Sequence, residues 1–571
     1  MLRRSCIFWR GFSPSIFAVV FLVLAIWGGL GRLDAALARG GKALSISRTA
    51  AAEWWSEAER WAWSQIENGE TADFNKRENC GQAPAPDEKN EHDKAWRDPC
   101  RTVRADFVKD ILTKAPWREA TPLEGVNILG ARIVGDLHLE NVRLLRAIVI
   151  AESLIDGAIM LGQARTESLF AVAGSLVTGR FNASSFHSES ELFLSGTKFK
   201  SDVVLISAKV VDDFEATGAS VDGLLSANAL QAGSFLVLNA NFNEMSLYEM
   251  KVTRTVDMRG ARFRGGISAD LLHVGGDLLM SDAEYAKLIH LAFTSVDGAV
   301  DLRGASFNDV NLSGAAIGKD LVIGESSPGR TTIWTSINLR NAHVKNIPDE
   351  WRVWQSKERL FLAKQSLVLD GFTFEHIGAF KQQGQGQTQS ELRNPDVRWW
   401  DKWAKLDPEY SPSPYSQLAA AFKASGDADA ADEIQFLGRE RARQTICDKG
   451  LSFDCWLQSV LGVGVGYGIG AYTFRALFWV LLLSAASAVF LKLWVPEAQR
   501  EGTSLLWCFG ASLSRLLPGV DLSKEFADFF DGPFRPRFNF WLASWFWFIR
   551  FAGVVLGASL IAAVAGLTHG P

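Results

Sequence analysis

The stretch "LRAIVIAESLIDGAIMLGQARTESLFAVAGSLV", residues 145–177, decides the fold because it contains three consecutive copies of one eleven-residue unit. In each copy, apolar residues stand at positions four and six and often at eleven, and a Gly or Ala stands near position eight or nine. Further units begin at residues 123, 134, 200, 253 and 297, and three units, at 233, 243 and 308, are shortened to ten residues. Repetition at a short fixed period is typical of solenoid proteins.

The unit predicts a short β-strand followed by a turn. Positions four and six share one face because side chains alternate along a strand, and the small residues mark corners where the backbone bends tightly. Two units make a coil of about 22 residues, as the spacing of Gly135, Gly157 and Gly179 indicates. We therefore expect a right-handed parallel β-helix of roughly nine coils with an apolar interior. A β-sandwich, the alternative, would show hairpin turns such as Asn-Gly at varied spacing.

Sequence on both sides of the repeat is suited to cover the open ends of such a β-helix. A tryptophan-rich helical pattern precedes the repeat, and the helical stretch "SPYSQLAAAFKASGDADAADEIQFLGRERARQ" follows it. The expected organisation is a signal peptide or membrane anchor (1–39), a Trp-rich helical cap (40–122), the β-helix (123–327), terminal coils (328–380), a helical hairpin with a juxtamembrane segment (381–472), and two transmembrane helices with an intervening loop (473–571).

Three apolar segments predict contact with a lipid bilayer. Residues 16–30 follow three arginines and precede an Ala-Leu-Ala site that a signal peptidase could cut, as in a signal peptide or an N-terminal anchor. Residues 474–494 and 551–567 are long enough to span or nearly span a membrane. Tryptophans just before the last segment are typical of the membrane interface. The net charge of −5 gives no basic field, so we expect no nucleic-acid partner.

The order of several segments resembles a known group of proteins. "GAR" corners in the repeat, "SLVLDGF", the helical hairpin, "RALFWVLLL" and "SLSRLLPGVDL" occur in the same order as in bacterial pentapeptide-repeat-like membrane proteins, often labelled membrane-associated oxidoreductases. The resemblance covers most of the chain from about residue 105 onward. It implies a bacterial membrane location and, by its usual label, redox activity.

The residues themselves do not support redox or other catalysis. A dinucleotide site needs a glycine fingerprint between a strand and a helix, and the glycines of "GVGVGYGIG", residues 462–470, lead into an apolar segment instead. The histidines are scattered, and His138 and His290 fall at outward position five of their units. We therefore predict no catalytic residue, no cofactor and no metal ligand, and an enzyme is the less favoured class.

Two alternative functions remain open at this stage. Glu215, Asp257 and Asp301 fall at position five of alternate units and hence on one face, as in the acidic clefts of β-helical glycan-active hydrolases or lyases, although a solvated face is favoured. The second alternative is a two-helix channel or transport subunit, because residues 465–468 read Val-Gly-Tyr-Gly. A selectivity filter lies between two membrane helices, whereas this motif precedes both, so we expect a flexible approach to the bilayer. Residues 504–522 do lie between them, and we expect an interfacial helix there.

Cysteines and basic residues bear on the compartment. Cys80 and Cys100 share one loop-rich segment, and Cys447 and Cys455 lie eight apart just before the membrane, so two disulfides are feasible in an oxidising space. Lysines and arginines near the membrane ends number nine against eight, which does not select an orientation. Together with the signal-like start, the cysteine pairs favour a periplasmic solenoid at the bacterial inner membrane.

One flank of the predicted solenoid is a candidate interaction face. Position five of alternate units gives Val149, Ala171, Phe193, Val237 and Leu279 on one face, against His138, Asn182, Ser226, Ser268 and His290 on the other. A row of exposed apolar residues along several coils is large enough to signal an interface. Either the chain's own helices at 54–63 or 415–436 cover it, or a protein partner or a second copy does. The predicted function is therefore a non-enzymatic, membrane-anchored scaffold or interaction protein.

Overall fold

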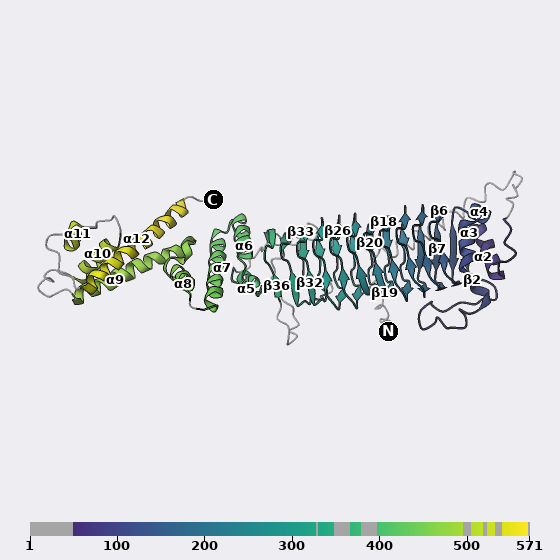
Figure 1. Ribbon diagram of the computed structural model, residues 1–571, viewed down its shortest axis with the longest axis horizontal. Coiled ribbons are helices and arrows are strands. Elements are labelled where there is room, and N and C mark those ends of the chain that lie inside the picture. Colours follow the sequence, from purple (N-terminus) through teal and green to yellow (C-terminus); the bar gives the residue numbers. More distant parts are fainter. Residues whose placement is uncertain are drawn as a thin grey trace, which may run out of the picture. The chain divides into compact units, whose positions relative to one another are not determined.

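The computed structural model describes residues 49–326, 329–347, 366–377, 397–450, 452–494, 504–517, 522–531 and 540–568 (Figure 1). The expected signal peptide or anchor at 1–39 lies outside the described residues. Most of the chain N-terminal to the apolar helices forms a parallel β-solenoid of about 10 turns with about 22 residues per turn. The predicted fold class is thereby confirmed.

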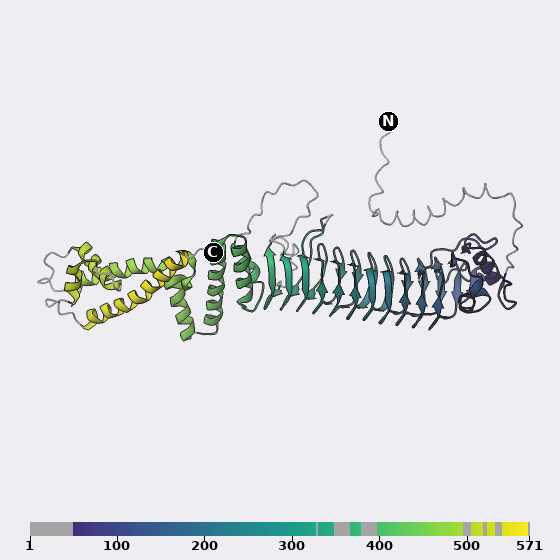
Figure 2. The same ribbon diagram turned by 90° about the horizontal axis from the view of Figure 1, so that it is seen from above.

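Each coil is built from short parallel strands that stack on the coils before and after it (Figures 1 and 2). In the first complete coil these are β3 (Val126–Leu129), β4 (Arg132–Val134), β5 (Leu137–His138) and β6 (Arg143–Leu144), and the next coil begins at β7 (Ile148–Ala151). Most eleven-residue units carry two short strands where one was expected, whereas the stretch 209–246 has one longer strand per unit. The corner lies at positions eight and nine, as expected, and the second strand follows it, as β4 follows β3.

The strands belong to two extended parallel sheets. The 19-stranded sheet contains β1 (Ala72–Asp73), β3, β6, β7, β10 (Arg165–Thr166), β11 (Phe170–Ala173), β14 (His187–Ser188), β15 (Leu192–Phe193), β18 (Lys209–Glu215), β20 (Gln231–Leu236), β22 (Lys251–Val252), β23 (Val256–Asp257), β26 (His273–Val274), β27 (Leu278–Leu279), β30 (Ser295–Val296), β31 (Val300–Asp301), β33 (Ala316–Val322), β35 (His343–Ile347) and β37 (Thr373–Ile377). The 18-stranded sheet contains β2 (Thr102–Arg104), β4, β5, β8 (Leu154–Asp156), β9 (Ile159–Met160), β12 (Leu176–Val177), β13 (Phe181–Asn182), β16 (Lys198–Phe199), β17 (Val203–Val204), β19 (Ser220–Ser226), β21 (Asn241–Ser246), β24 (Arg262–Phe263), β25 (Ile267–Ser268), β28 (Glu284–Tyr285), β29 (Ile289–His290), β32 (Asp309–Asn311), β34 (Ser336–Asn338) and β36 (Ser366–Val368).

Positions four and six of the units form the core, as the alternation predicts. Ile148 and Ile150 are fully buried, and Ile148 lies in register with Val126 and Phe170 of the neighbouring coils. Aromatic side chains also stack along the interior, where the rings of Phe263 and Tyr285 lie 4.9 Å apart. Removing each such side chain from water contributes about 1.5–3 kcal/mol, so the long shared core stabilises every coil through its neighbours.

Two of the register shifts that shorten a coil lie inside paired strands and not at corners. Between β18 and β20 the register shifts after Val210, and between β19 and β21 it shifts after Val221. On both sides of each shift the strands pair again with the next coil. The inward side chains therefore remain stacked although the coil is shorter.

The N-terminal cap supplies the first strands of the solenoid as well as helices. Strands β1 and β2 pair with β3 and β4, so the β-structure starts before the expected boundary at residue 123. Its helices are α2 (Glu57–Glu67), η2 (Pro99–Arg101), α3 (Ala105–Thr113) and α4 (Trp117–Ala120). Ser56 caps α2, and the buried Glu59 accepts hydrogen bonds from Ser56 and Arg104. Burial opposes its ionisation, but these hydrogen bonds lower the pKa of Glu59.

The C-terminal cap consists of α5 (Val397–Ala404), α6 (Ser413–Ala424) and α7 (Ala428–Asp448). Main-chain groups of the last coil bond to the turn after α5, where Leu367 donates to the Leu406 carbonyl at 3.1 Å and Leu369 donates to Asp407 at 3.0 Å. Helix α6 packs against β37. The exposed edge of the final coil is thus covered by helices, as the sequence predicts.

The remaining helices are α8 (Phe453–Val465), η3 (Gly466–Gly468), η4 (Gly470–Phe474), α9 (Arg475–Trp494), α10 (Leu505–Leu516), α11 (Lys524–Asp531) and α12 (Phe540–Thr568). Two of them, within Gly470–Trp494 and Ala543–Ile561, are long and apolar enough to cross a membrane. They pack together, and the Trp545 indole donates to the Ser487 hydroxyl at 3.1 Å.

Candidate interaction face

The predicted apolar face corresponds to one outward row of the solenoid, which we call the Phe193 row. Its members follow one another in register through successive coils: Val149, Ala171, Phe193, Glu215, Leu236, Asp257, Leu279, Asp301 and Val322. Val149, Phe193 and Leu279 are half-buried, while Ala171 is buried between its neighbours.

Val237 does not belong to this row. It is fully buried in the core, and Leu236 occupies the outward position. The prediction is wrong because the unit starting at residue 233 has only ten residues, and the register of the β18–β20 strand pair shifts by one residue between Val210 and Asp213. Counting five positions from the start of the unit therefore reaches one residue too far.

Acidic residues interrupt the apolar row. The residues predicted to form an acidic face and those predicted to form an apolar face alternate along this one row of the solenoid. The carboxylates of Asp257 and Asp301 are nearly buried, and each forms an ion pair two residues along its own coil, with Arg259 at 2.6 Å and with Arg303 at 2.7 Å. The hydrogen bond to Asp257 raises the pKa of Arg259, and Asp301 has the same effect on Arg303. These paired carboxylates do not form the acid and base of a glycan-cleaving site.

Glu215, the third predicted acid, lies between Phe193 and Leu236 in the row and accepts a hydrogen bond from the Ser195 hydroxyl at 3.2 Å. Apolar and charged coils therefore alternate along much of the row. Such a surface offers regularly spaced apolar contacts with polar groups between them, a composition usual for protein interfaces.

The helices expected to cover the row contact the two ends of the solenoid instead. Helix α2 contacts β1, β2 and β3, and helix α6 contacts β37. The Phe193 row runs along the coils between these ends. The contacts of these two helices therefore lie at the ends of the row and not along it.

The opposite row is mostly polar, although it also contains Met160 and Val204, and it bears a groove of about 380 Å³. Ser268 and His290 lie in register along it, and Leu224 and Met245 contribute apolar surface. His138, on the same face, is exposed and lies 3.1 Å from the Glu140 carboxylate. Within the residues that the structure describes, no cluster of three His, Cys, Asp or Glu side chains could hold a metal ion.

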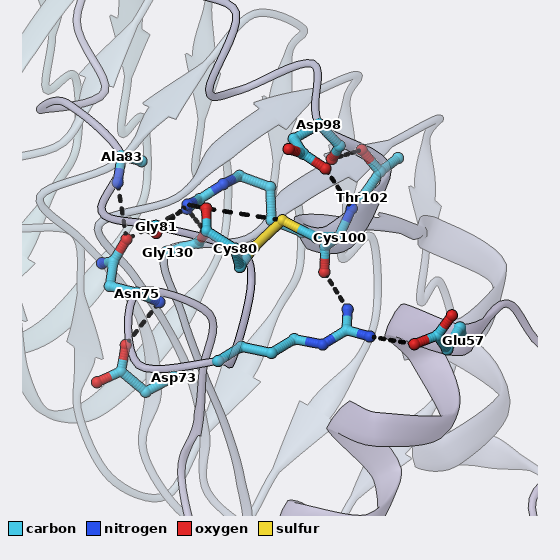
Figure 3. The surroundings of a disulfide bond; sticks show 12 residues. Glu57, Asp73, Asn75, Cys80, Gly81, Ala83, Asp98, Cys100, Thr102 and Gly130 are labelled. Carbon is cyan, nitrogen blue, oxygen red and sulfur yellow. Dashed lines mark hydrogen bonds and ion pairs between the residues drawn. A yellow bond between two sulfur atoms is a disulfide. The ribbon is translucent and has the colours of Figure 1, made fainter.

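Cys80 and Cys100 form a disulfide that closes the loop of the N-terminal cap (Figure 3). Trp96 of this loop is fully buried against Leu154 and Leu176 on the outside of the first coils. The loop therefore covers part of a solenoid flank, a contact that no pattern in the sequence predicts.

Arg101 joins the disulfide loop to the first coil. Its buried guanidinium donates to the carbonyls of Gly130 at 2.8 Å, of Cys80 at 3.1 Å and of Gly81 at 2.6 Å, and it lies over the Trp96 ring. No pattern in the sequence indicates this role, because these contacts depend on how the loop returns to the coil.

The second disulfide, between Cys447 and Cys455, joins α7 to α8 directly before the apolar helices. The glycine segment 462–470 that follows, expected to be a flexible approach to the bilayer, is closely packed at Gly462 and Gly466. A Cβ on Gly462 would lie 2.7 Å from the Tyr467 hydroxyl, and a Cβ on Gly466 would lie 2.6 Å from the Tyr472 carbonyl oxygen. The Tyr467 hydroxyl also donates to Glu440 of α7 at 3.2 Å, and burial raises the pKa of Tyr467 to about 12.

Helix α10, predicted at the membrane interface, packs into the bundle of apolar helices. Ala511 and Ser512 are fully buried, and Leu516 packs against Ala476 and Val480 of α9. The Leu516 carbonyl lies so close to Gly553 that no larger residue fits there. The Val-Gly-Tyr-Gly residues precede this bundle, which removes the geometry that a selectivity filter requires.

The comparisons give no relative for this chain: no family model, no curated protein and no solved structure matches it. Function must therefore be argued from the geometry of the chain itself.

Proposed function

We propose that the protein is a non-enzymatic scaffold of the bacterial envelope, anchored in the inner membrane by its apolar helices, and that the Phe193 row binds a protein partner or a second copy. The observation that carries this proposal is the alternation of half-buried apolar side chains and ion-paired carboxylates along one row. Fixed spacing between contact points suits a surface that organises other proteins.

The two alternative functions have less support. A glycan-cleaving site needs two carboxyl groups that act together. Asp257 and Asp301 are each paired with an arginine, so neither is free to act with Glu215. A channel needs a lined path through the membrane, and the glycine segment that suggested one is packed against α7 and η4. The resemblance to membrane-associated oxidoreductases supports the membrane location, while its redox label finds no ligand set among the described residues.

The first prediction concerns the Phe193 row. Phe193→Asp is expected to keep the protein folded, with a loss of about 1 kcal/mol in the free energy of unfolding, because the side chain points outward and is already half-exposed. It should remove most of the crosslinked complexes formed in native membranes, because a charge replaces an apolar contact. Thermal unfolding and chemical crosslinking with mass spectrometry measure the two effects.

The matched control is Val204→Asp, a half-buried outward residue of β17 in the other sheet. This variant should leave the crosslinking profile unchanged. If both variants retain the wild-type profile, or both lose it equally, the Phe193 row is not the interface.

The second prediction concerns the compartment, where we propose that the solenoid lies in the periplasm because its cap contains the Cys80–Cys100 disulfide. In intact cells, a membrane-impermeant maleimide should label neither cysteine until an impermeant reductant is added, after which both should be labelled. Peptide-level mass spectrometry reads the two sites separately from the other cysteines. Labelling of both sites without reductant would contradict the bond, and no labelling after reduction would place the cap on the cytoplasmic side.

A further inference from the structure

Helix α8 exposes an unusually large share of its apolar side chains. Those that face outward are Phe453 (72%), Trp456 (60%), Leu457 (37%), Val460 (47%), Leu461 (37%) and Val463 (58%). At 100° per residue they cover an arc of roughly 160° around the helix. The buried residues, Cys455 and Gly462, lie on the opposite side. The helix is therefore amphipathic with its apolar side turned away from the protein.

Both ends of α8 are held in place, so this orientation is built into the fold. At the N-terminal end, Ser452 caps the helix, the Cys447–Cys455 disulfide ties it to α7, and Arg443 donates to the Ser459 hydroxyl at 3.4 Å. At the C-terminal end, the Trp479 indole donates to the Val463 carbonyl at 2.9 Å.

The position of α8 identifies what covers its apolar side. Trp479 belongs to the first turns of α9, so the C-terminal end of α8 lies beside the start of a helix long enough to cross a membrane. Arg475, which opens α9, also donates to the Gly462 carbonyl at 3.1 Å and lies over the rings of Phe436 and Tyr472. The exposed side of α8 is thereby continuous with the lipid-facing surface that α9 begins.

We propose that α8 lies in the membrane surface, with its apolar side inserted between lipid headgroups and acyl chains, and that its disulfide and its contacts with α9 fix the solenoid to the bilayer at one angle. Amphipathic helices with Trp and Phe on the apolar side bind in this way, and Trp456 suits the interface because its ring is apolar and its N–H is polar. Helix α8 alone is too short to span the bilayer. This inference rests on the proposed membrane anchoring.

The experiment places a nitroxide at single sites on the full chain, in vesicles of phosphatidylcholine and phosphatidylglycerol. Val460→Cys and Val463→Cys are compared with Gln444→Cys, an exposed residue of α7, in a background with Cys6→Ala and Cys508→Ala. Relative collision rates with oxygen, which concentrates in lipid, and with a water-soluble nickel complex report the surroundings of each label. We expect the oxygen-to-nickel ratio at 460 and 463 to exceed that at 444 several-fold.

Two results would overturn the proposal. A nickel accessibility at 460 and 463 equal to that at 444 would place α8 in water, and shielding from both reagents would mean that protein covers it. Carbonate extraction of the same vesicles separates this inference from the one on which it rests. A chain that is extracted refutes the membrane anchoring and α8 insertion together, whereas a chain that stays with water-exposed labels refutes α8 insertion alone.

Discussion

Replacing Arg101 with methionine is expected to release the disulfide loop from the solenoid and to lower the local free energy of unfolding by about 4 kcal/mol. The guanidinium is buried and donates to three main-chain carbonyls, so its removal leaves these acceptors without their donor in a site closed to water. Methionine fills similar volume, which limits the loss to hydrogen bonding and charge. Because the loop covers Leu154 and Leu176, its release should also expose apolar surface.

Hydrogen exchange of the peptides spanning residues 75–101 measures this effect directly. Arg97→Met is the control, since Arg97 lies in the same loop with an exposed side chain, and it should change exchange little. Wild-type protection in the Arg101 variant would show that the disulfide alone holds the loop. A uniform loss of protection along the solenoid would show instead that the cap governs the stability of every coil.

Gly157→Ala is expected to cost about 3 kcal/mol in the free energy of unfolding, because two coils meet there main chain to main chain. A Cβ on Gly157 would lie 2.6 Å from the carbonyl carbon of Gly135, and a Cβ on Gly179 would lie 2.5 Å from the carbonyl carbon of Gly157. Backbone atoms cannot rotate away as a side chain can, so neighbouring coils must separate. Denaturant unfolding followed by circular dichroism gives the difference.

The control for this substitution is Gly162→Ala in the same coil. Its Cβ would meet only a Glu140 side-chain carbon at 3.8 Å, and neither Gly157 nor Gly162 has a positive φ. Both substitutions reduce the entropy of the unfolded chain equally, so the difference between them isolates the steric effect. Equal stability of the two variants would contradict the close approach of the coils.

The sequence predicted the coil correctly but not its inner division. A period of eleven residues fixes which side chains stack inside, since a slip by one residue would turn them outward. The alternation of Ile148 and Ile150 does not continue past the corner, where the inward residue is Ile155, so it does not reveal the second strand. The error at Val237 arises because one residue is lost inside the β18–β20 strand pair, which moves the outward position to Leu236.

The sequence placed the outward row correctly except at Val237, but the prediction did not include the acidic residues that interrupt the row. The repeats "VDMRG" and "VDLRG" contain an acid and an arginine two residues apart, a spacing that places both on one side of a strand. These pairs predict that an arginine neutralises the charge of Asp257 and that of Asp301. The contacts of Arg101 and the orientation of α8 could not be predicted, because both depend on chain segments that return from elsewhere in the fold.

The parallel pairing of each coil with the next means that the solenoid can change in length without being redesigned. Each coil adds about 4.8 Å along the stacking direction, and a whole coil inserted between two others meets the same inward rows on both sides. Ten such coils hold the two caps about 48 Å apart. Descendants of this chain can therefore lengthen or shorten that separation in discrete steps, one coil at a time, while keeping both ends intact. The number of coils therefore sets the distance between the two caps.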